Sequence, residues 1–186
     1  MTKKKQVYIS LLRGINVAGQ KSIKMADLRA IYQSLSLNHV KSYIQSGNLV
    51  FHSDINNKPL LSEKITQAIL THYSFDVPVF ILTPAELTSA HKKLPFQHID
   101  LEQEASKILI CFLSGVASNS SAILTPYLKD NEQLEIIDNV LYLYCQDGFG
   151  RSKLTHSNIE KKLNVNATVR NLKTINKLIE LADSMT

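Results

Sequence analysis

The stretch that decides the fold is residues 7–25, which read VYISLLRGINVAGQKSIKM. It begins with six mainly apolar residues, a run that predicts a buried strand. Arg13 and a loop with Gly14 and Gly19 come next, and a helix is expected from Met25. Glycines let backbone N–H groups converge on one point, and a helix N-terminus favours anions. A candidate ligand site is therefore expected between this strand and this helix.

The glycine loop lacks the nucleotide-binding P-loop motif. Gly14 and Gly19 have the required separation, but Gln20 stands where the motif needs lysine, and Lys21 comes one residue late. One extra residue turns a helical side chain by about 100°. Two interpretations remain. Either Arg13 beside the loop is an anion ligand, or the glycines only permit a tight connection and Arg13 is a solvated strand end.

The composition is that of a globular protein with a packed core: 186 residues, 44% hydrophobic and 20% charged. No apolar run approaches the 18 or so residues of a membrane span, and residues 7–12 are too short for a signal-peptide core. These features predict a soluble, cytoplasmic protein without membrane contact. Cys111 and Cys145 lie in apolar, strand-like runs, which predicts buried reduced thiols and no metal site around them.

The net charge of +5 is unevenly distributed along the chain. Residues 1–100 hold twelve Lys/Arg against six Asp/Glu, and residues 151–186 hold seven against three. Residues 101–150 are acidic, with two against seven. A basic surface region of this kind is compatible with an anionic partner, although a small net charge also serves solubility alone.

The first half of the chain predicts a complete α+β subdomain. The expected elements are a strand at 7–12, a helix at 25–35, strands at 40–44 and 49–51, a helix at 59–73 and a strand at 77–82. This β-α-β-β-α-β order is that of the ferredoxin-like fold. Pro78 should place the last strand at a sheet edge or delay its start. Residues 1–83 are therefore expected to form a ferredoxin-like subdomain.

The second half predicts a smaller α/β subdomain that ends in helices. Thr83 and Glu86 are spaced as a capping box, and residues 84–106 are expected to form this helix and a connecting loop. The subdomain would span residues 107–186. Its expected elements are a strand at 108–113, a helix at 118–128, a hairpin of 133–137 with 140–145, a helix capped by Ser157 and Glu160 that runs to about 163, and a C-terminal helix from Thr168.

Four ordered motifs resemble those of domain-of-unknown-function family 1697. They are LRGINVAG at 12–19, YIQSGN at 43–48, GRSKL at 150–154 and ATVRN at 167–171. Ala18 stands where many members have a second adjacent glycine, and Leu172 replaces a common aromatic residue. The resemblance implies a cytosolic α+β protein of two subdomains, the first ferredoxin-like, with no settled activity.

The polar and glycine residues of these motifs form the candidate ligand site. We expect several of them to meet in a cleft between the subdomains and to bind a small anionic ligand, such as one that bears phosphate. The alternative is that the same groups cap helices, fill turns and tie the subdomains together. The candidate residues are Arg13, Gly14, Asn16, Gly19, Gln45, Ser46, Asn48, Arg151, Ser152, Lys153, Arg170 and Asn171.

Other functions have less support from the residues. Ser46 lacks the flanks of a nucleophile elbow, the six histidines have no metal-ligand spacing, and no paired carboxylates stand out. Neither a metal nor a cofactor is therefore predicted, and whether the protein is an enzyme is left open. A ferredoxin-like sheet could bind RNA through Tyr8, Tyr43 and Phe51, but no RNP run is present and packing in the core or at its rim is expected for these rings. A role as a non-enzymatic interaction protein would leave no mark in the sequence. The oligomeric state leaves none either.

Overall fold

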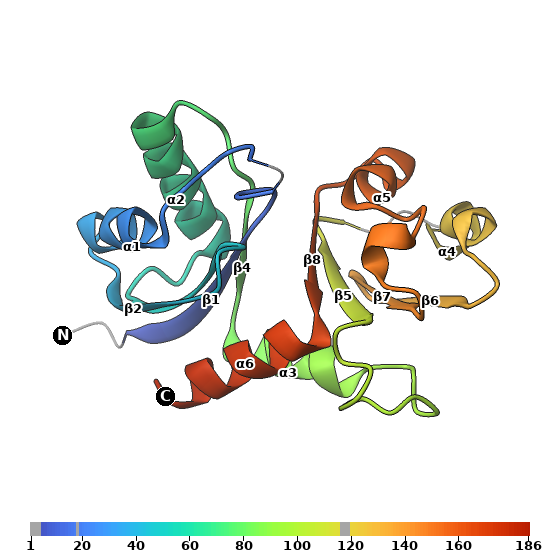
Figure 1. Ribbon diagram of the computed structural model, residues 1–186. Helices are drawn as coiled ribbons and strands as arrows, with labels where there is room; N and C mark the ends of the chain where they lie inside the picture. The colour runs from blue at the N-terminus through green and yellow to red at the C-terminus, as the bar shows by residue number, and fades with distance from the viewer. Residues whose placement is uncertain (1–4, 18, 116–119) are drawn as a thin grey trace. The chain divides into compact units, whose positions relative to one another are not determined.

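The computed structural model describes residues 5–17, 19–115 and 120–186. It is a mixed α/β protein with two four-stranded antiparallel sheets and, in the described residues, six α-helices (Figure 1). Contacts along the chain divide it into unit 1, residues 1–87 and 177–186, and unit 2, residues 88–176. The division falls inside α3 (Pro84–Lys92) and α6 (Leu172–Asp183). The contacts thus assign residues 177–186 to unit 1, whereas the sequence interpretation grouped them with the second subdomain.

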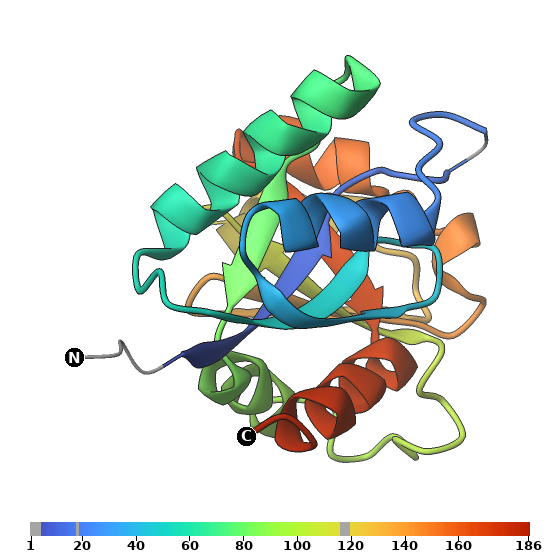
Figure 2. The ribbon, with the colours of Figure 1, turned by 90° about the vertical axis from the view of Figure 1, so that its left-hand side faces the viewer.

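Unit 1 contains one sheet with strand order β2-β3-β1-β4. Figure 2 shows α1 and α2 lying across one face of it. The fourth strand begins directly after Pro78 and lies at the edge of the sheet, as predicted. The elements are β1 (Gln6–Leu12), α1 (Met25–Ser34), β2 (Asn38–Tyr43), β3 (Asn48–Ser53), α2 (Lys58–Tyr73) and β4 (Val79–Leu82).

The core of unit 1 forms between this sheet and its two helices. Tyr8 and Phe51 point from the sheet into it, and the ring of Tyr32 on α1 meets Phe51 edge-on at 5.3 Å between centroids. The Tyr32 hydroxyl is 2.8 Å from Ser10 Oγ, so its polar end is satisfied in the core. Burial raises the pKa of Tyr32 above its ordinary value. Tyr8 and Phe51 are thus core residues, as the sequence suggested.

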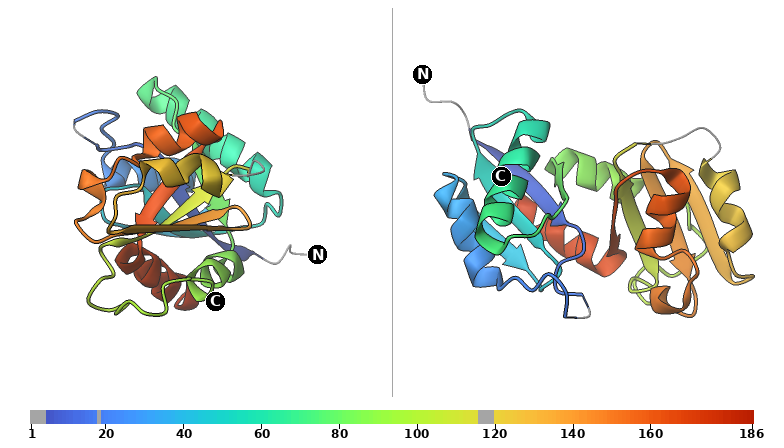
Figure 3. Two further views of the ribbon diagram at one scale, coloured as in Figure 1. Left: turned by 90° about the vertical axis from the view of Figure 1, so that its right-hand side faces the viewer. Right: turned by 90° about the horizontal axis from the view of Figure 1, so that it is seen from above.

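Unit 2 contains a second antiparallel sheet with strand order β6-β7-β5-β8. The left view of Figure 3 shows α4 and α5 over one face of it. β5 lies in the middle and is buried along its whole length, as its continuous apolar sequence predicted. Cys111 and Cys145 are free and buried. The elements are β5 (Ile108–Leu113), α4 (Ser120–Leu124), β6 (Glu132–Ile137), β7 (Val140–Cys145), α5 (His156–Leu163) and β8 (Ala167–Asn171), with 3-10 turns at Thr125–Tyr127 and Phe149–Arg151.

Two helix predictions in unit 2 were wrong. The C-terminal helix does not begin at Thr168, because residues 167–171 pair with β5 as strand β8, and α6 starts at Leu172. Thr168 and Val169 are β-branched and favour this extended conformation. The helix expected at 118–128 ends at Leu124 and continues as a 3-10 turn that contains Pro126, while residues 118 and 119 lie outside the described ones.

The N-terminus of α5 also differs from the prediction. Thr155 is the N-cap, and its side chain accepts a hydrogen bond from the Asn158 amide at 3.3 Å. Glu160, expected in a capping box with Ser157, instead accepts from the Ala167 amide at 2.9 Å. His156 Nε2 accepts from the Val169 amide at 3.2 Å. Two side chains of α5 therefore satisfy backbone donors of the edge strand β8, which protects the edge from foreign pairing.

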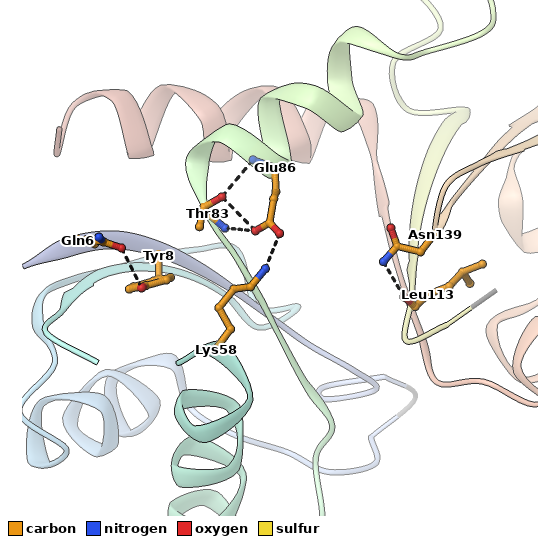
Figure 4. A network of polar contacts seen from close by, with 7 residues as sticks. All are labelled: Gln6, Tyr8, Lys58, Thr83, Glu86, Leu113 and Asn139. Atoms are coloured by element: carbon orange, nitrogen blue, oxygen red, sulfur yellow. Dashed lines mark hydrogen bonds and ion pairs between the residues drawn. The ribbon is translucent and has the colours of Figure 1, made fainter. Parts of the chain in front are cut away.

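The capping box at the start of α3 is confirmed. Glu86 Oε2 accepts from the Thr83 amide at 2.8 Å, and Thr83 Oγ1 accepts from the Glu86 amide at 3.2 Å (Figure 4). Lys58, at the start of α2, forms an ion pair with the same carboxylate. Burial raises the pKa of Glu86, but the hydrogen bonds from Lys58 and Thr83 outweigh burial and hold the pKa below its ordinary value.

Candidate functional site

The glycine loop after β1 is closed by the side chain of Asn16. Its Oδ1 accepts from the Ile23 amide at 2.8 Å, and its Nδ2 donates to the Ile23 carbonyl at 2.9 Å. Nδ2 also donates to the Gln45 carbonyl at 2.7 Å, which ties this loop to the turn between β2 and β3. Gly14, Asn16 and Gly19 all have left-handed backbones, with φ of 71°, 55° and 76°. Asn16 is thus a structural residue whose amide is fully engaged.

The turn between β2 and β3 is held in the same way. Asn48 is fully buried, and its Nδ2 donates to the Tyr43 carbonyl at 3.1 Å and to Ser46 Oγ at 2.9 Å. The Gly47 carbonyl accepts from the Leu12 amide at 2.8 Å. Residues 13–21 and 44–48, here called the loop pair, are therefore fastened together at one end of the first sheet.

Two further candidates, Arg13 and Gln45, belong to the loop pair. Arg13 is half-buried, and its backbone amide donates to the Pro78 carbonyl at 2.9 Å. The Gln45 side chain is exposed and has no hydrogen bond to another described residue, although its carbonyl holds Asn16. The amide and hydroxyl residues of the loop pair act mainly as ties, which leaves few of their polar groups for a ligand.

In unit 2, residues 148–155 form a second glycine loop, here called the cationic loop. Gly148 has φ of 87°, and the buried Ser152 accepts from the Leu154 amide at 3.1 Å through Oγ. Ser152 has an extended backbone, with φ of −73° and ψ of 148°. Its two neighbours in the chain, Arg151 and Lys153, are both exposed.

Arg151 and Lys153 differ from the other charged candidates because their side chains contact no described residue through a hydrogen bond or ion pair. The cationic loop leads directly into α5, whose first turn contains no acidic residue. The Ser157 amide in that turn donates to no acceptor in the described part of the chain. Two free cations and an open helix N-terminus therefore lie within a few residues of one another.

The last two candidates serve the structure of unit 2. Arg170 is buried, with 7% of its surface exposed, and its Nη1 donates to Thr168 Oγ1 at 3.0 Å and to the Val169 carbonyl at 2.8 Å. Burial lowers the pKa of Arg170 to about 10. Asn171 Oδ1 accepts from the Thr174 amide at 2.9 Å, so Asn171 caps α6.

The structure also brings together two histidines that lie thirteen positions apart in the sequence. The rings of His39 and His52 are 5.1 Å apart between centroids, on the neighbouring strands β2 and β3. Neither sequence spacing nor periodicity pointed to this pair, because strand register sets it. No group of three or more His, Cys, Asp or Glu that could hold a metal ion exists among the described residues. Likewise, none of the described helices has the length and apolar character needed to cross a membrane.

Together the fold and these loops define a two-unit α+β protein with a tied glycine loop in one unit and a cationic glycine loop in the other. Residues 5–142 match the family described as "Protein of unknown function (DUF1697)", and the chain belongs to this family. The motifs at 150–154 and 167–171 lie outside the matched residues.

One solved structure similar to this chain is that of the conserved bacterial protein SP0830 from Streptococcus pneumoniae. It is 24% identical in sequence, with a TM-score of 0.72. The match covers 96% of this chain and 99% of that chain. At this identity the likeness concerns the fold alone. A search of curated proteins found no match.

Proposed function

We propose that the protein binds a small anionic ligand at the cationic loop of unit 2. The observation that carries this proposal is the pair of exposed, unpartnered cations, Arg151 and Lys153, directly before the N-terminus of α5. Backbone N–H groups at a helix N-terminus attract anions, and a guanidinium can hold a phosphate or carboxylate through two parallel hydrogen bonds.

The surroundings of the loop favour this assignment. Thr155 and Asn158 fix the first turn, since the Asn158 amide donates to the Thr155 hydroxyl and Asn158 Nδ2 donates to the Lys153 carbonyl at 2.6 Å. Ser152 is buried between the two cations, which restricts the backbone that carries them. A loop that is fixed before the ligand arrives loses less conformational entropy on binding.

The loop pair of unit 1 offers fewer groups to a ligand than the cationic loop does. Asn16, Ser46 and Asn48 already use their side chains within the protein, and Ser152 and Asn171 do so in unit 2. Arg13 and Gln45 are the side chains of unit 1 that we retain in the proposed ligand set. That both sets meet in one cleft stays a prediction.

The proposed fold of residues 1–83 is ferredoxin-like. Two observations support it: the element order β-α-β-β-α-β and the strand order β2-β3-β1-β4. Such sheets bind RNA by stacking bases on strand aromatics, but Tyr8 and Phe51 are 2% and 0% exposed. Nucleic-acid binding therefore has less support than anion binding. A purely non-enzymatic interaction role is favoured by no particular contact.

The proposal can be tested by measuring thermal unfolding with phosphate, sugar phosphates, nucleotides and short single-stranded RNA. A ligand present at about 100 times its Kd should stabilise the protein by about 2.7 kcal/mol. Replacing both Arg151 and Lys153 with alanine should abolish the shift produced by any ligand that binds.

Lys161→Ala is the matched control. Lys161 is exposed on the same helix, but it lies in the last turn, where the helix dipole disfavours anions. Removing this charge should leave the shift intact. Equal loss in the control would indicate general attraction to a basic surface, and no shift with any phosphate compound would refute the proposal. A shift with RNA alone would instead favour the nucleic-acid alternative.

A further inference from the structure

His39 occupies an irregular position at the edge of the first sheet. Asn38 pairs with His52, but the register between β2 and β3 shifts before Lys41, which places His39 in a bulge. Its φ of 51° lies in the left-handed region, where non-glycine residues are uncommon. Bulges re-aim side chains and are frequent next to functional sites. Here the rings of His39 and His52 approach to 5.1 Å between centroids, with an interplanar angle of 74°.

The hydrogen bonding of His52 leaves one of its nitrogens ready to act as a ligand. Its Nε2 is 3.1 Å from the carbonyl oxygen of Met185. A carbonyl only accepts, so Nε2 carries the hydrogen and Nδ1 of the neutral ring carries a lone pair. Nδ1 is buried and has no hydrogen-bond partner among the described residues. A buried polar atom without a partner is costly and calls for an explanation.

We propose that His39 and His52 form a two-imidazole site for a divalent transition-metal ion, with His52 Nδ1 as one donor. Imidazole nitrogens suit zinc, copper and nickel. In metal sites, a ligating histidine commonly donates its other ring N–H to a carbonyl, as His52 does to Met185.

The ring separation fits this assignment. With zinc–nitrogen distances of about 2.1 Å and a tetrahedral angle at the metal, the centres of two ligating rings lie about 5.2 Å apart. The observed separation is 5.1 Å. The angle between the ring planes does not oppose ligation, since each ring can turn about its own metal–nitrogen bond.

The other histidines do not combine a neighbouring histidine ring with a buried ring nitrogen that has no hydrogen-bond partner. His156 accepts a backbone hydrogen bond through Nε2, and His98 is 3.2 Å from Gln133. His72 and His91 show no ring contact with a second histidine in the described residues. No third protein ligand of the His, Cys, Asp or Glu type joins the pair there, so water would complete the coordination.

Zinc binding tests the site directly. Untagged protein would be titrated with zinc chloride by calorimetry, and the histidine ring nitrogens would be followed by NMR. The expected result is one zinc ion bound per chain, with the ring signals of His39 and His52 shifted and those of the other histidines unchanged. Zinc should also raise the unfolding temperature, because it binds the folded chain and joins β2 to β3.

His39→Asn is the decisive variant, because asparagine tolerates the left-handed backbone at this exposed position. It should fold and lose zinc binding, and His52→Ala should lose it as well. His72→Asn removes an exposed histidine from α2 and should bind zinc like the unchanged protein. Zinc binding that persists in His39→Asn, or no binding by the unchanged protein, would overturn the proposal.

Discussion

Replacing Gly47 with alanine should weaken unit 1 more than any other single-methyl addition in its glycine loops. A Cβ at this position would lie 2.6 Å from Leu12 Cβ and 2.9 Å from Ile15 Cδ1. Leu12 and Ile15 are both buried, so neither can move away cheaply. The φ of Gly47 is 76°, a conformation that L-residues rarely adopt.

The expected loss of stability is the sum of two costs, that of the left-handed backbone and that of the steric clash. The left-handed conformation costs about 1–2 kcal/mol for alanine. Forcing an extra methyl group into a packed core costs about 1–3 kcal/mol. Gly47→Ala should therefore lower the free energy of unfolding by about 2–5 kcal/mol. For a chain of this length, each kcal/mol corresponds to about 2–4 °C in Tm.

Gly14→Ala measures the cost of the left-handed backbone alone, without the steric clash. Gly14 has a similar φ of 71°, but a Cβ there would meet nothing within 4 Å. The entropy that alanine removes from the unfolded chain is the same in both variants and cancels in the comparison. Urea unfolding followed by far-UV circular dichroism would give both values. Gly47→Ala costing no more than Gly14→Ala would refute the steric argument.

Three other changes should have defined effects. Asn16→Ala removes three hydrogen bonds and should destabilise unit 1 by about 2–4 kcal/mol in the same urea assay. A loss of stability smaller than that expected for one hydrogen bond would contradict the conclusion that Asn16 holds the two loops together. Glu160→Ala leaves the amide of the fully buried Ala167 without its acceptor and should cost about 1–3 kcal/mol, with faster hydrogen exchange at that amide as the specific readout. Burial raises the pKa of Cys145 to about 12 and that of Cys111 above its ordinary value, so at pH 8 neither thiol should react with iodoacetamide until the protein is unfolded, and fast reaction of the folded protein would contradict this burial.

The elements with a local signal were predictable from the sequence. The capping box of Thr83 and Glu86, the edge position of the strand after Pro78, and the hairpin across residues 138–139 all depend on neighbours in the chain. The strand β8 was missed because Thr168 begins a helical apolar stripe while residues 167–171 pair with β5, which lies more than fifty residues away. Long-range pairing outweighed the local periodicity there.

The candidate site was predictable in composition but less so in the role of each residue. The sequence motif does not distinguish an asparagine whose amide contacts a ligand from one whose amide closes a loop. Asn16 and Asn48 do the latter, and their partners, the carbonyls of Gln45 and Tyr43, could not be identified from spacing. The charged residues were no easier to interpret, because the sequence grouped Arg170 with Arg151 and Lys153, and only the structure shows that Arg170 is buried. A buried cation must find partners within the protein, whereas an exposed one need not. The pairing of His39 with His52 depends on a bulge, which no sequence pattern announced.

The two glycine loops of this protein therefore allow experiments to separate stability from the proposed binding. In the loop pair, left-handed backbones and side-chain amides close the loops on themselves, so substitutions there should change the free energy of unfolding. In the cationic loop, the hydroxyls of Ser152 and Thr155 accept hydrogen bonds from backbone amides, while Arg151 and Lys153 are exposed and have no hydrogen-bond or ion-pair partner among the described residues. Removing these two charges breaks no hydrogen bond or ion pair with a described residue, and surface changes of this kind usually alter stability by less than about 0.5 kcal/mol. Any loss of ligand-induced stabilisation in that variant would thus report on the proposed anion site, because the fold that carries these residues would remain intact.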